Sequence, residues 1–301
     1  MNEKSLKSGV LFALAAYSMW GVAPMYFKLL TSVPALEIVM HRIVWSVLVL
    51  CVLIFVRKKF SQVRAAIRDP KILKTLLISG LLLAVNWLLF IWAVNNNHLL
   101  DASLGYFINP LFNVLLARLF LQERLTRLQL LAVFVALMGV SILIFSYGKV
   151  PWIALTLAIT FSIYGLLRKK VAVESMPGLL IESSMMLPFA LLYWLIADTS
   201  SGNMIANTVD LNVILLLAGV VTTAPLLCFT AAARRIRYTT LGFFQYIGPS
   251  IMFLLAVMLY LEPLDNARVI TFVFVWSALL IYVYDSYRTY RKTKVILIKN
   301  D

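Results

Sequence analysis

Apolar runs of about twenty residues recur along almost the whole sequence, and they limit the fold more than any other feature. A helix of that length, at about 1.5 Å per residue, crosses the roughly 30 Å hydrocarbon core of a bilayer. Hydrophobic residues make up 62% of the chain and charged residues 13%, against about half and a quarter in soluble proteins. The sequence therefore predicts an all-α integral membrane protein.

Ten of these runs are predicted to cross the membrane, with boundaries accurate to a few residues. The predicted spans are 8–30, 35–56, 72–94, 100–121, 126–146, 150–167, 178–197, 212–232, 238–261 and 266–286. The sixth span is short, and only Gln122, Glu123 and Arg124 separate the fourth from the fifth. Nine spans is therefore the alternative count.

The 27 Lys and Arg residues are distributed unevenly over the connecting segments. One side holds Lys4 and Lys7, the loop from Arg57 to Lys74, Arg124 and Arg127, Arg168 to Lys170, Arg234 to Arg237, and Arg288 to Lys299. The other side holds only Lys28, Lys149 and Arg268. Because cytoplasmic loops carry the excess of Lys and Arg, both termini are predicted to be cytoplasmic and the number of spans even. The net charge of +14 then reflects a solvated, topology-setting face, and no nucleic-acid partner is expected.

The two halves of the chain are related at a spacing of about 140 residues. Residues 17–21 match 161–165, and 104–107 match 241–244. Pro110 and Pro249 are each followed 13 residues later by a glutamate, Glu123 and Glu262. We predict two five-helix repeats, 8–147 and 150–286, followed by a cytoplasmic basic tail, 287–301.

An odd number of spans in each repeat inverts the second repeat relative to the first. Inverted repeats are a recurring architecture of secondary transporters, whose substrate site lies near the membrane midplane between the halves. The repeat therefore predicts a secondary transporter that works by alternating access.

Several short segments also resemble a known family. They are Glu37 with the segment 41–46 (HRIVWS), 91–95 (IWAVN), 103–111 (SLGYFINPL) and 245–249 (QYIGP). With these segments the chain resembles the RarD proteins of the drug/metabolite transporter superfamily, over nearly its whole length. The resemblance implies two EamA-type five-helix units, a location in the bacterial inner membrane, and a permease or exporter loosely linked to chloramphenicol resistance.

Arg42 is the strongest single candidate for a substrate-binding residue. It lies about seven residues into the second span, where an unpaired cation is costly and marks a pathway or a buried pair. Its repeat counterpart is Met186 or Leu187, so the charge belongs to one half only. The structural alternative is that Arg42 snorkels outward or pairs with Glu37 as a topology clamp.

A polar face in the fourth span is the second candidate. Tyr106, Asn109, Pro110 and Asn113 recur at the three-and-four spacing of one helical face. Gln245, Tyr246 and Pro249 occupy the same depth in the ninth span. We predict that the tyrosines and amides contact substrate and that the two prolines bend gating helices. Helix-to-helix hydrogen bonding of the amides is the alternative.

Trp20, Tyr164 and Asn86 are further predicted substrate contacts. Trp20 and Tyr164 correspond in the repeat and could wall a site for an aromatic or amphipathic solute, although most membrane aromatics belong to the core or the interface. Asn86 is a lone polar group in the third span. No acid lies at the centre of a span, so coupling to protons through Glu37, Glu182 or Asp101 is left open.

Motifs of enzymes are missing from the sequence. It contains no Gly-rich phosphate loop, no HExxH and no GxSxG, and its two histidines leave little for metal chemistry. Cys51 and Cys228 both fall in predicted spans, so neither a disulfide nor a thiolate-bound metal is expected. We expect no cofactor, no metal and no enzymatic activity. The alternatives are a membrane-embedded enzyme acting on a lipid or an isoprenoid carrier, and a sensor or assembly partner.

Overall fold

In the computed structural model, which describes residues 3–96, 98–148, 150–197, 199–259 and 266–300, all regular structure is helical. The helices are α1 (Glu3–Phe27), η1 (Lys28–Leu30), α2 (Ala35–Val56), α3 (Phe60–Arg68), α4 (Pro70–Asn95), α5 (Leu99–Phe120), α6 (Arg127–Tyr147), α7 (Trp152–Lys170), α8 (Ser175–Ile196), α9 (Val209–Ala233), α10 (Tyr238–Phe244), α11 (Ile247–Met258) and α12 (Asn266–Asn300). Eight of the described helices are long and apolar enough to cross a membrane. The predicted all-α membrane class is confirmed.

The count of ten spans stays a prediction, because the fourth and ninth predicted spans are less regular than the others. Helix α5 covers the fourth predicted span from Leu99 to Phe120, but the side chains at its start are only partly described. The ninth span is not one helix, because α10 ends at Phe244 and α11 begins at Ile247. The loop after the second span contains α3, and α12 continues helically into the predicted tail.

Local capping sets the ends of α6. Thr126 Oγ1 accepts a hydrogen bond from Gln129 N at 3.1 Å, while Gln129 Oε1 accepts one from Thr126 N at 3.3 Å. This capping box satisfies backbone groups that have no partner within the helix. Gly148 ends the helix with φ 74°, a left-handed conformation that suits glycine.

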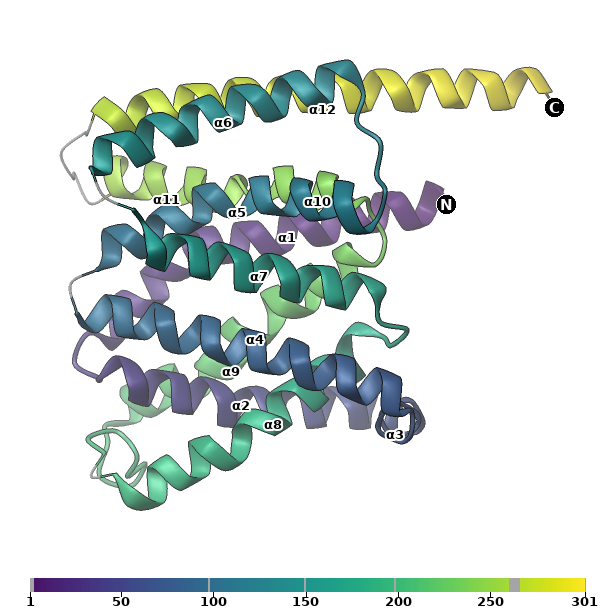
Figure 1. Cartoon of the computed structure of the whole chain (residues 1–301). Helices are drawn as coiled ribbons and strands as arrows, with labels where there is room; N and C mark the ends of the chain where they lie inside the picture. Colours follow the sequence, from purple (N-terminus) through teal and green to yellow (C-terminus); the bar gives the residue numbers. More distant parts are fainter. Residues whose placement is uncertain (1–2, 97, 149, 198, 260–265, 301) are drawn as a thin grey trace.

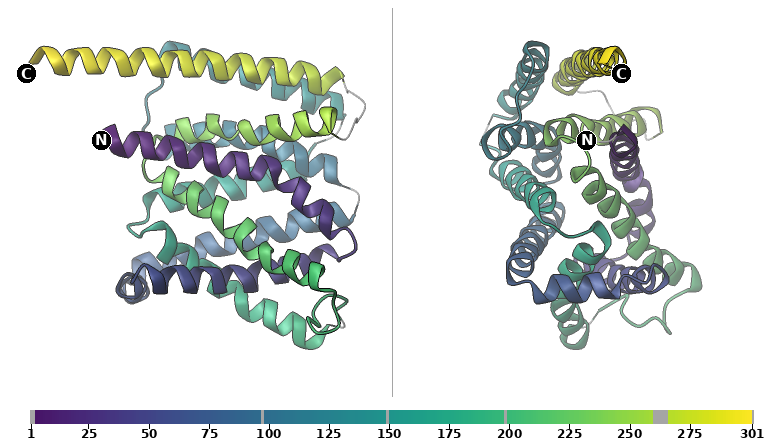
Figure 2. Two further views of the ribbon diagram at one scale, coloured as in Figure 1. Left: turned by 180° about the vertical axis from the view of Figure 1, so that it is seen from behind. Right: turned by 90° about the vertical axis from the view of Figure 1, so that its right-hand side faces the viewer.

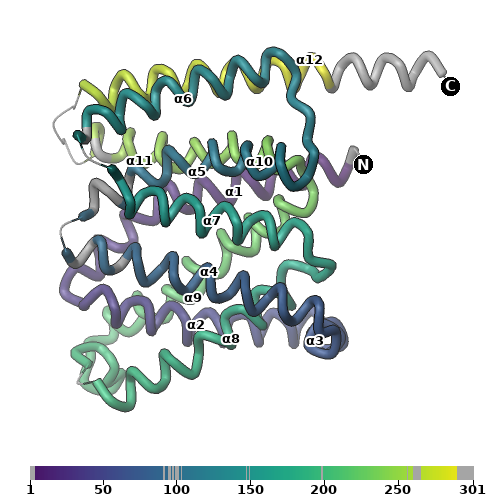
Figure 3. The backbone as a smooth tube through the Cα atoms, viewed as in Figure 1, coloured from purple at the N-terminus to yellow at the C-terminus, as the bar shows by residue number. Residues whose placement is uncertain are grey.

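The long helices run side by side, and both termini lie at the same end of the bundle (Figure 1; Figure 2). The backbone tube shows α6 and α12 as a pair along one edge of the bundle (Figure 3). Helix α1 packs on α9 and α11, whereas α7 packs on α4 and α5. The first helix of each predicted repeat thus packs on the third and fourth spans of the other repeat. This exchange of partners supports the predicted repeat, which stays a prediction.

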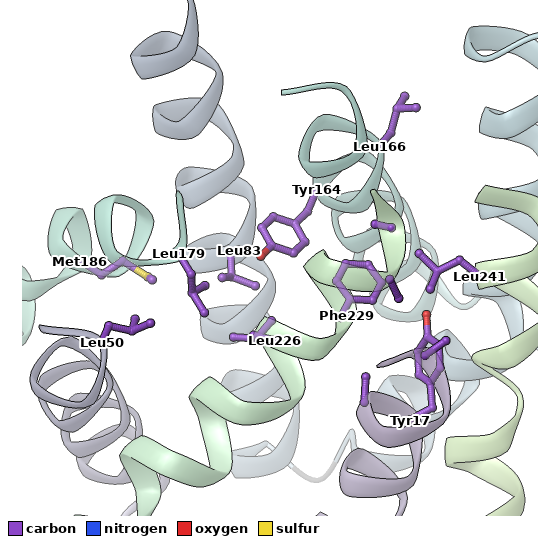
Figure 4. Packing of buried hydrophobic residues seen from close by; sticks show 14 of the residues in the cluster. Tyr17, Leu50, Leu83, Tyr164, Leu166, Leu179, Met186, Leu226, Phe229 and Leu241 are labelled. Carbon is purple, nitrogen blue, oxygen red and sulfur yellow. The ribbon is translucent and has the colours of Figure 1, made fainter. Parts of the chain in front are cut away.

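The largest apolar core joins helices from both halves. Tyr17, Leu83, Tyr164 and Phe229 are buried in it, and Figure 4 shows Tyr164 and Phe229 with their rings close together. These side chains come from α1, α4, α7 and α9. The core therefore holds the two halves together, and a site between the halves must be built around it.

A close approach of α2 and α9 lies beside this core. A Cβ atom at Gly219 would stand 2.5 Å from the backbone carbon of Trp45, so only glycine fits there. Small residues let the backbones of membrane helices approach closely, and this close packing stabilises their association where the hydrophobic effect does not. One turn away, the same contact brings Thr222 of α9 next to Arg42 of α2.

Candidate functional site

Arg42 lies at a point where five helices meet. Its Nε donates a hydrogen bond to Thr222 Oγ1 of α9 at 2.8 Å. The guanidinium carbon lies 4.8 Å from the ring centroid of Trp87 in α4 and 5.4 Å from that of Phe27 in α1. These distances are within the range of cation–π interactions.

Two tyrosines complete the surroundings of this cation. Tyr26 of α1 and Tyr106 of α5 are close enough to interact electrostatically with the guanidinium. The Tyr26 hydroxyl donates to the backbone oxygen of Ile214 at 2.8 Å, which anchors its ring to α9. Across the described part of the chain, no carboxylate forms an ion pair with Arg42. Aromatic rings and hydroxyl groups therefore surround a cation that is only half-buried.

The alternative that Arg42 pairs with Glu37 was wrong. The Glu37 carboxylate instead accepts hydrogen bonds from Ser200 N at 3.0 Å and from Ser201 N at 2.9 Å. It holds the connection between α8 and α9 against the start of α2. His41 Nε2 lies 3.2 Å from Ser201 Oγ and so belongs to the same anchor. The role of Glu37 in ion coupling stays a prediction.

The amides of the predicted polar face are buried between helices. Asn109 Oδ1 accepts a hydrogen bond from Ser162 Oγ of α7 at 2.7 Å. Asn113 Nδ2 donates to Gln245 Oε1 at 2.8 Å, where α10 gives way to α11. These are the contacts of the helix-to-helix alternative. Asn113 Oδ1 has no hydrogen-bond partner within the described residues, so one acceptor remains available at this junction.

Tyr246 and Asn86 also make contacts between helices. The Tyr246 hydroxyl donates to the backbone oxygen of Phe107 in α5 at 3.3 Å. Asn86 Nδ2 donates to the Leu157 backbone oxygen and to Thr160 Oγ1 of α7, both at 2.9 Å. These hydrogen bonds join helices to one another. They do not test the substrate contacts of the two residues, which stay predictions.

The predicted aromatic walls lie at different depths in the protein. Trp20 is partly exposed, with ring centroids 5.7 Å from Phe161 and 5.8 Å from Phe229. Tyr164 is fully buried and stacks on Phe229 at 6.1 Å (Figure 4). Its hydroxyl lies 3.5 Å from Glu182 Oε2. Trp20 is therefore the better placed of the two to meet a solute.

A second arginine, Arg168, was missed by the sequence analysis. It was expected on the solvated basic face, but both Arg168 and Glu182 are fully buried, with Arg168 Nε 3.7 Å from Glu182 Oε1. Ser79 of α4 donates a hydrogen bond to the same carboxylate. The expectation was wrong because Arg168 lies in the last turn of α7, beside α8. There the Glu182 carboxylate, and not water, lies next to the guanidinium. The four-residue spacing of Tyr164 and Arg168 places both on one helical face and could have indicated this group.

The two prolines differ in their helical positions. Pro110 lies in the interior of α5, whereas Pro249 lies in the first turn of α11. A first-turn proline loses no helical hydrogen bond, but an interior proline does. The gating roles stay predictions, but equal bends in the two helices are not expected.

Glu123 accepts hydrogen bonds from Tyr238 N at 2.7 Å and Thr239 N at 3.0 Å, and so caps the start of α10. Its predicted counterpart Glu262 lies outside the described residues. Asp101 belongs to the first turn of α5, and its side chain is likewise outside the described part.

The eight described membrane-length helices define a multi-pass membrane protein, and the family and relatives that it matches are transporters. The EamA-like transporter family matches residues 7–145. The chain is 52% identical to protein RarD of Escherichia coli over 97% of this chain and 99% of that protein. It is 32% identical to the chloramphenicol-sensitive protein RarD of Pseudomonas aeruginosa, over 94% of this chain and 96% of that one.

The chain belongs to the RarD family of EamA-type proteins in the drug/metabolite transporter superfamily, as its sequence motifs predicted. It is a multi-pass protein of the bacterial inner membrane. A solved structure aligns with a TM-score of 0.72 over 92% of this chain and 97% of that one, at 17% identity, and so shares the fold.

Proposed function

We propose that this protein is a secondary transporter that binds a small amphipathic metabolite or drug at Arg42 and moves it by alternating access. The observation that carries the proposal is the half-buried Arg42, which has aromatic rings and hydroxyl groups around it and no carboxylate among the described residues. An intramembrane cation without a counter-ion is expensive and is retained for function. A solute with an anionic or strongly polar group would supply the missing partner.

The surroundings of Arg42 support a solute that also carries an aromatic or apolar part. Nε is occupied by Thr222, whereas the planar fork of the guanidinium suits a carboxylate or another planar acceptor. Trp87 and Phe27 offer ring faces beside this fork. The name of the chloramphenicol-sensitive relative makes chloramphenicol, with its planar nitroaromatic ring, one candidate solute.

Alternating access is supported by the way the helices pair. Because α1 and α7 exchange equivalent partners across the two halves, each half could take the conformation that the other has left. The break between α10 and α11 supplies a point where one half can bend. Whether protons couple to this cycle is left open, and Glu37, Glu182 and Asp101 remain the carboxylates to examine. Lipids of the inner membrane are the other proposed partners.

Counterflow in proteoliposomes tests the proposal. Labelled chloramphenicol and labelled hydrocinnamate, an aromatic carboxylate, are the probes, and a carrier exchanges one of them against unlabelled solute. Arg42→Ala should lower exchange roughly 10- to 100-fold, the loss expected for a charge-assisted hydrogen bond. Arg235→Ala is the matched control, because Arg235 also lies over a ring, 5.2 Å from Phe12. A parental rate in Arg42→Ala would refute the site, and turnover of a lipid or isoprenoid without exchange would favour the enzyme alternative.

The proposed orientation places both termini in the cytoplasm. It rests on the distribution of Lys and Arg and is supported by the two termini lying at one end of the bundle (Figure 1). Reporter fusions at Asn96 and Asn203 should read as periplasmic, and fusions at Arg64 and Arg235 as cytoplasmic. A cytoplasmic reading at Asn203 would contradict the inverted repeat.

A further inference from the structure

Helix α3 differs from its neighbours in direction. It joins α2 to α4 but lies across the end of the bundle, seen end-on in Figure 1 and from the side in the right view of Figure 2. It lies at the end of the bundle that also holds both termini. A helix in this position would run along the membrane surface at the depth of the lipid headgroups.

The two faces of α3 have different surroundings. Ala66 is buried against Leu76 and Ile181, so one face is attached to the bundle. On the other face, 57% of Phe60 and 51% of Ile67 are exposed. The apolar surface of α2 continues onto this face, since the rings of Phe55 and Phe60 lie 6.3 Å apart.

A shallow hollow of about 410 Å³ lies along this outer face of α3. Its lining residues are Phe60, Val63, Arg64, Ile67 and Arg68. The two arginines are four residues apart and so stand on the same side of the helix. The hollow has an apolar lining, and Arg64 and Arg68 are among the residues that form it.

The acidic residues near α3 are committed elsewhere. Asp69 Oδ1 accepts hydrogen bonds from Lys71 N at 2.9 Å and Ile72 N at 3.2 Å, where it caps α4. Glu174 forms its ion pair with Lys59. In the parts of the chain that the structure describes, no carboxylate therefore pairs with Arg64 or Arg68.

We propose that the outer face of α3 is a binding site for an anionic phospholipid of the adjoining leaflet. Arg64 and Arg68 hold the phosphate, and an acyl chain lies over Phe60, Val63 and Ile67. Charge complementarity favours this occupant, because the segment from Arg57 to Lys74 carries seven basic residues and one acidic residue. Basic residues beside an amphipathic helix attract anionic lipids, whereas a zwitterionic lipid has no net charge to attract.

Native mass spectrometry of the purified full-length protein tests the proposal, with phosphatidylglycerol and phosphatidylcholine added at equal concentration. The double variant Arg64→Gln with Arg68→Gln should lower phosphatidylglycerol binding roughly 10- to 30-fold and leave phosphatidylcholine binding unchanged. The matched control is Arg124→Gln with Arg127→Gln, which removes the same charge from the same side of the bundle and should bind phosphatidylglycerol like the parent. Equal phosphatidylglycerol binding in both double variants would overturn the proposal.

A second arm separates a lipid from a free phosphate. Phe60→Ser with Ile67→Ser keeps both arginines but removes apolar surface, and should weaken phosphatidylglycerol binding several-fold. Inorganic phosphate at millimolar concentration should not displace the lipid. Unchanged lipid binding in this variant, or full displacement by phosphate, would mean that the arginines hold only an anion. Unchanged elution volume and melting temperature confirm that each variant is folded.

Discussion

Arg42 and Arg168 both lie within membrane-length helices, yet their surroundings are opposite. Arg168 is fully buried, with Glu182 3.7 Å away. Arg42 is half-buried, and its described partners are the Thr222 hydroxyl and the rings of Phe27 and Trp87. Arg168 has a carboxylate beside it within the protein, whereas Arg42 has no carboxylate partner among the described residues.

On the proposed function, this difference separates a structural charge, Arg168, from a substrate-binding charge, Arg42. Removing one member of a buried ion pair leaves an uncompensated charge and costs stability. Removing Arg42 breaks no ion pair among the described residues, so we expect its loss to lower ligand binding more than stability. The two arginines should therefore differ in which measurement reports their loss.

The largest effect is expected for Glu182→Gln. Because Arg168 then loses its buried counter-ion, the free energy of unfolding should fall by about 3–5 kcal/mol. Thermal unfolding in detergent measures the change. Arg168→Met combined with Glu182→Leu removes both charges and should recover most of the loss. If Glu182→Gln melts at the parental temperature, the pair is not structural.

The next effect concerns the geometry around Arg42. Arg42→Lys keeps the charge but loses the planar fork, so exchange of a bound solute should fall about tenfold. Thr222→Val keeps the shape of the side chain but removes the acceptor for Nε, and should weaken solute binding about fivefold, the equivalent of about 1 kcal/mol. Both variants should melt within a few degrees of the parent. If Arg42→Lys transports at the parental rate, charge alone is sufficient and the fork is not used.

The third effect compares Pro110 in the first half of the chain with Pro249 in the second half. Pro110→Ala restores a backbone donor in the interior of α5 and should shift the protein toward one facing state. Pro249→Ala changes the first turn of α11, where no helical bond was missing, and should shift it less and in the opposite direction.

Single cysteines report these shifts by their rate of labelling, in protein from which Cys51 and Cys228 have been removed. Reporter positions are Asn96 and Asn203 at one end, and Arg64 and Arg124 at the other. In each proline variant, the labelling rate at one end of the bundle should rise while the rate at the other end falls. Shifts in the same sense, or none in protein that still transports, would mean that the prolines only pack the helices.

The smallest effect is expected at the ion pair between Lys59 and Glu174, which is partly exposed. Hydrogen bonds from Lys59 and Gln62 lower the pKa of Glu174 below its usual value of 4.5. A lowered carboxyl pKa stabilises the folded protein above the ordinary pKa, and this stabilisation is lost as the pH falls through the lowered value. Glu174→Gln should therefore cost less than about 1 kcal/mol at neutral pH, and its difference from the parent should shrink as the pH falls below 4.5. A loss as large as that of Glu182→Gln would contradict the distinction between buried and exposed pairs.

The contrast between the arginines also marks how far the sequence could predict the site. Arg42 was predicted to be a substrate-binding residue because its position within an apolar run can be counted along the chain. Arg168 was assigned to solvent because it stands in a basic cluster at the end of an apolar run. Only the packing of α7 on α4, and of α4 on α8, brings Glu182, which Ser79 also contacts, to its guanidinium.

The sequence alone determined the helical membrane class and the family, because hydropathy, helix length and short motifs are properties of contiguous residues. Tertiary structure alone decided which polar groups meet. Arg42 reaches Thr222 across 180 positions, and Asn113 reaches Gln245 across 132. It also decided where the ninth span breaks and where α3 lies. Partners so far apart in sequence depend on how whole helices pack. The membrane interior contains no water, so each polar group there forms its hydrogen bonds within the protein.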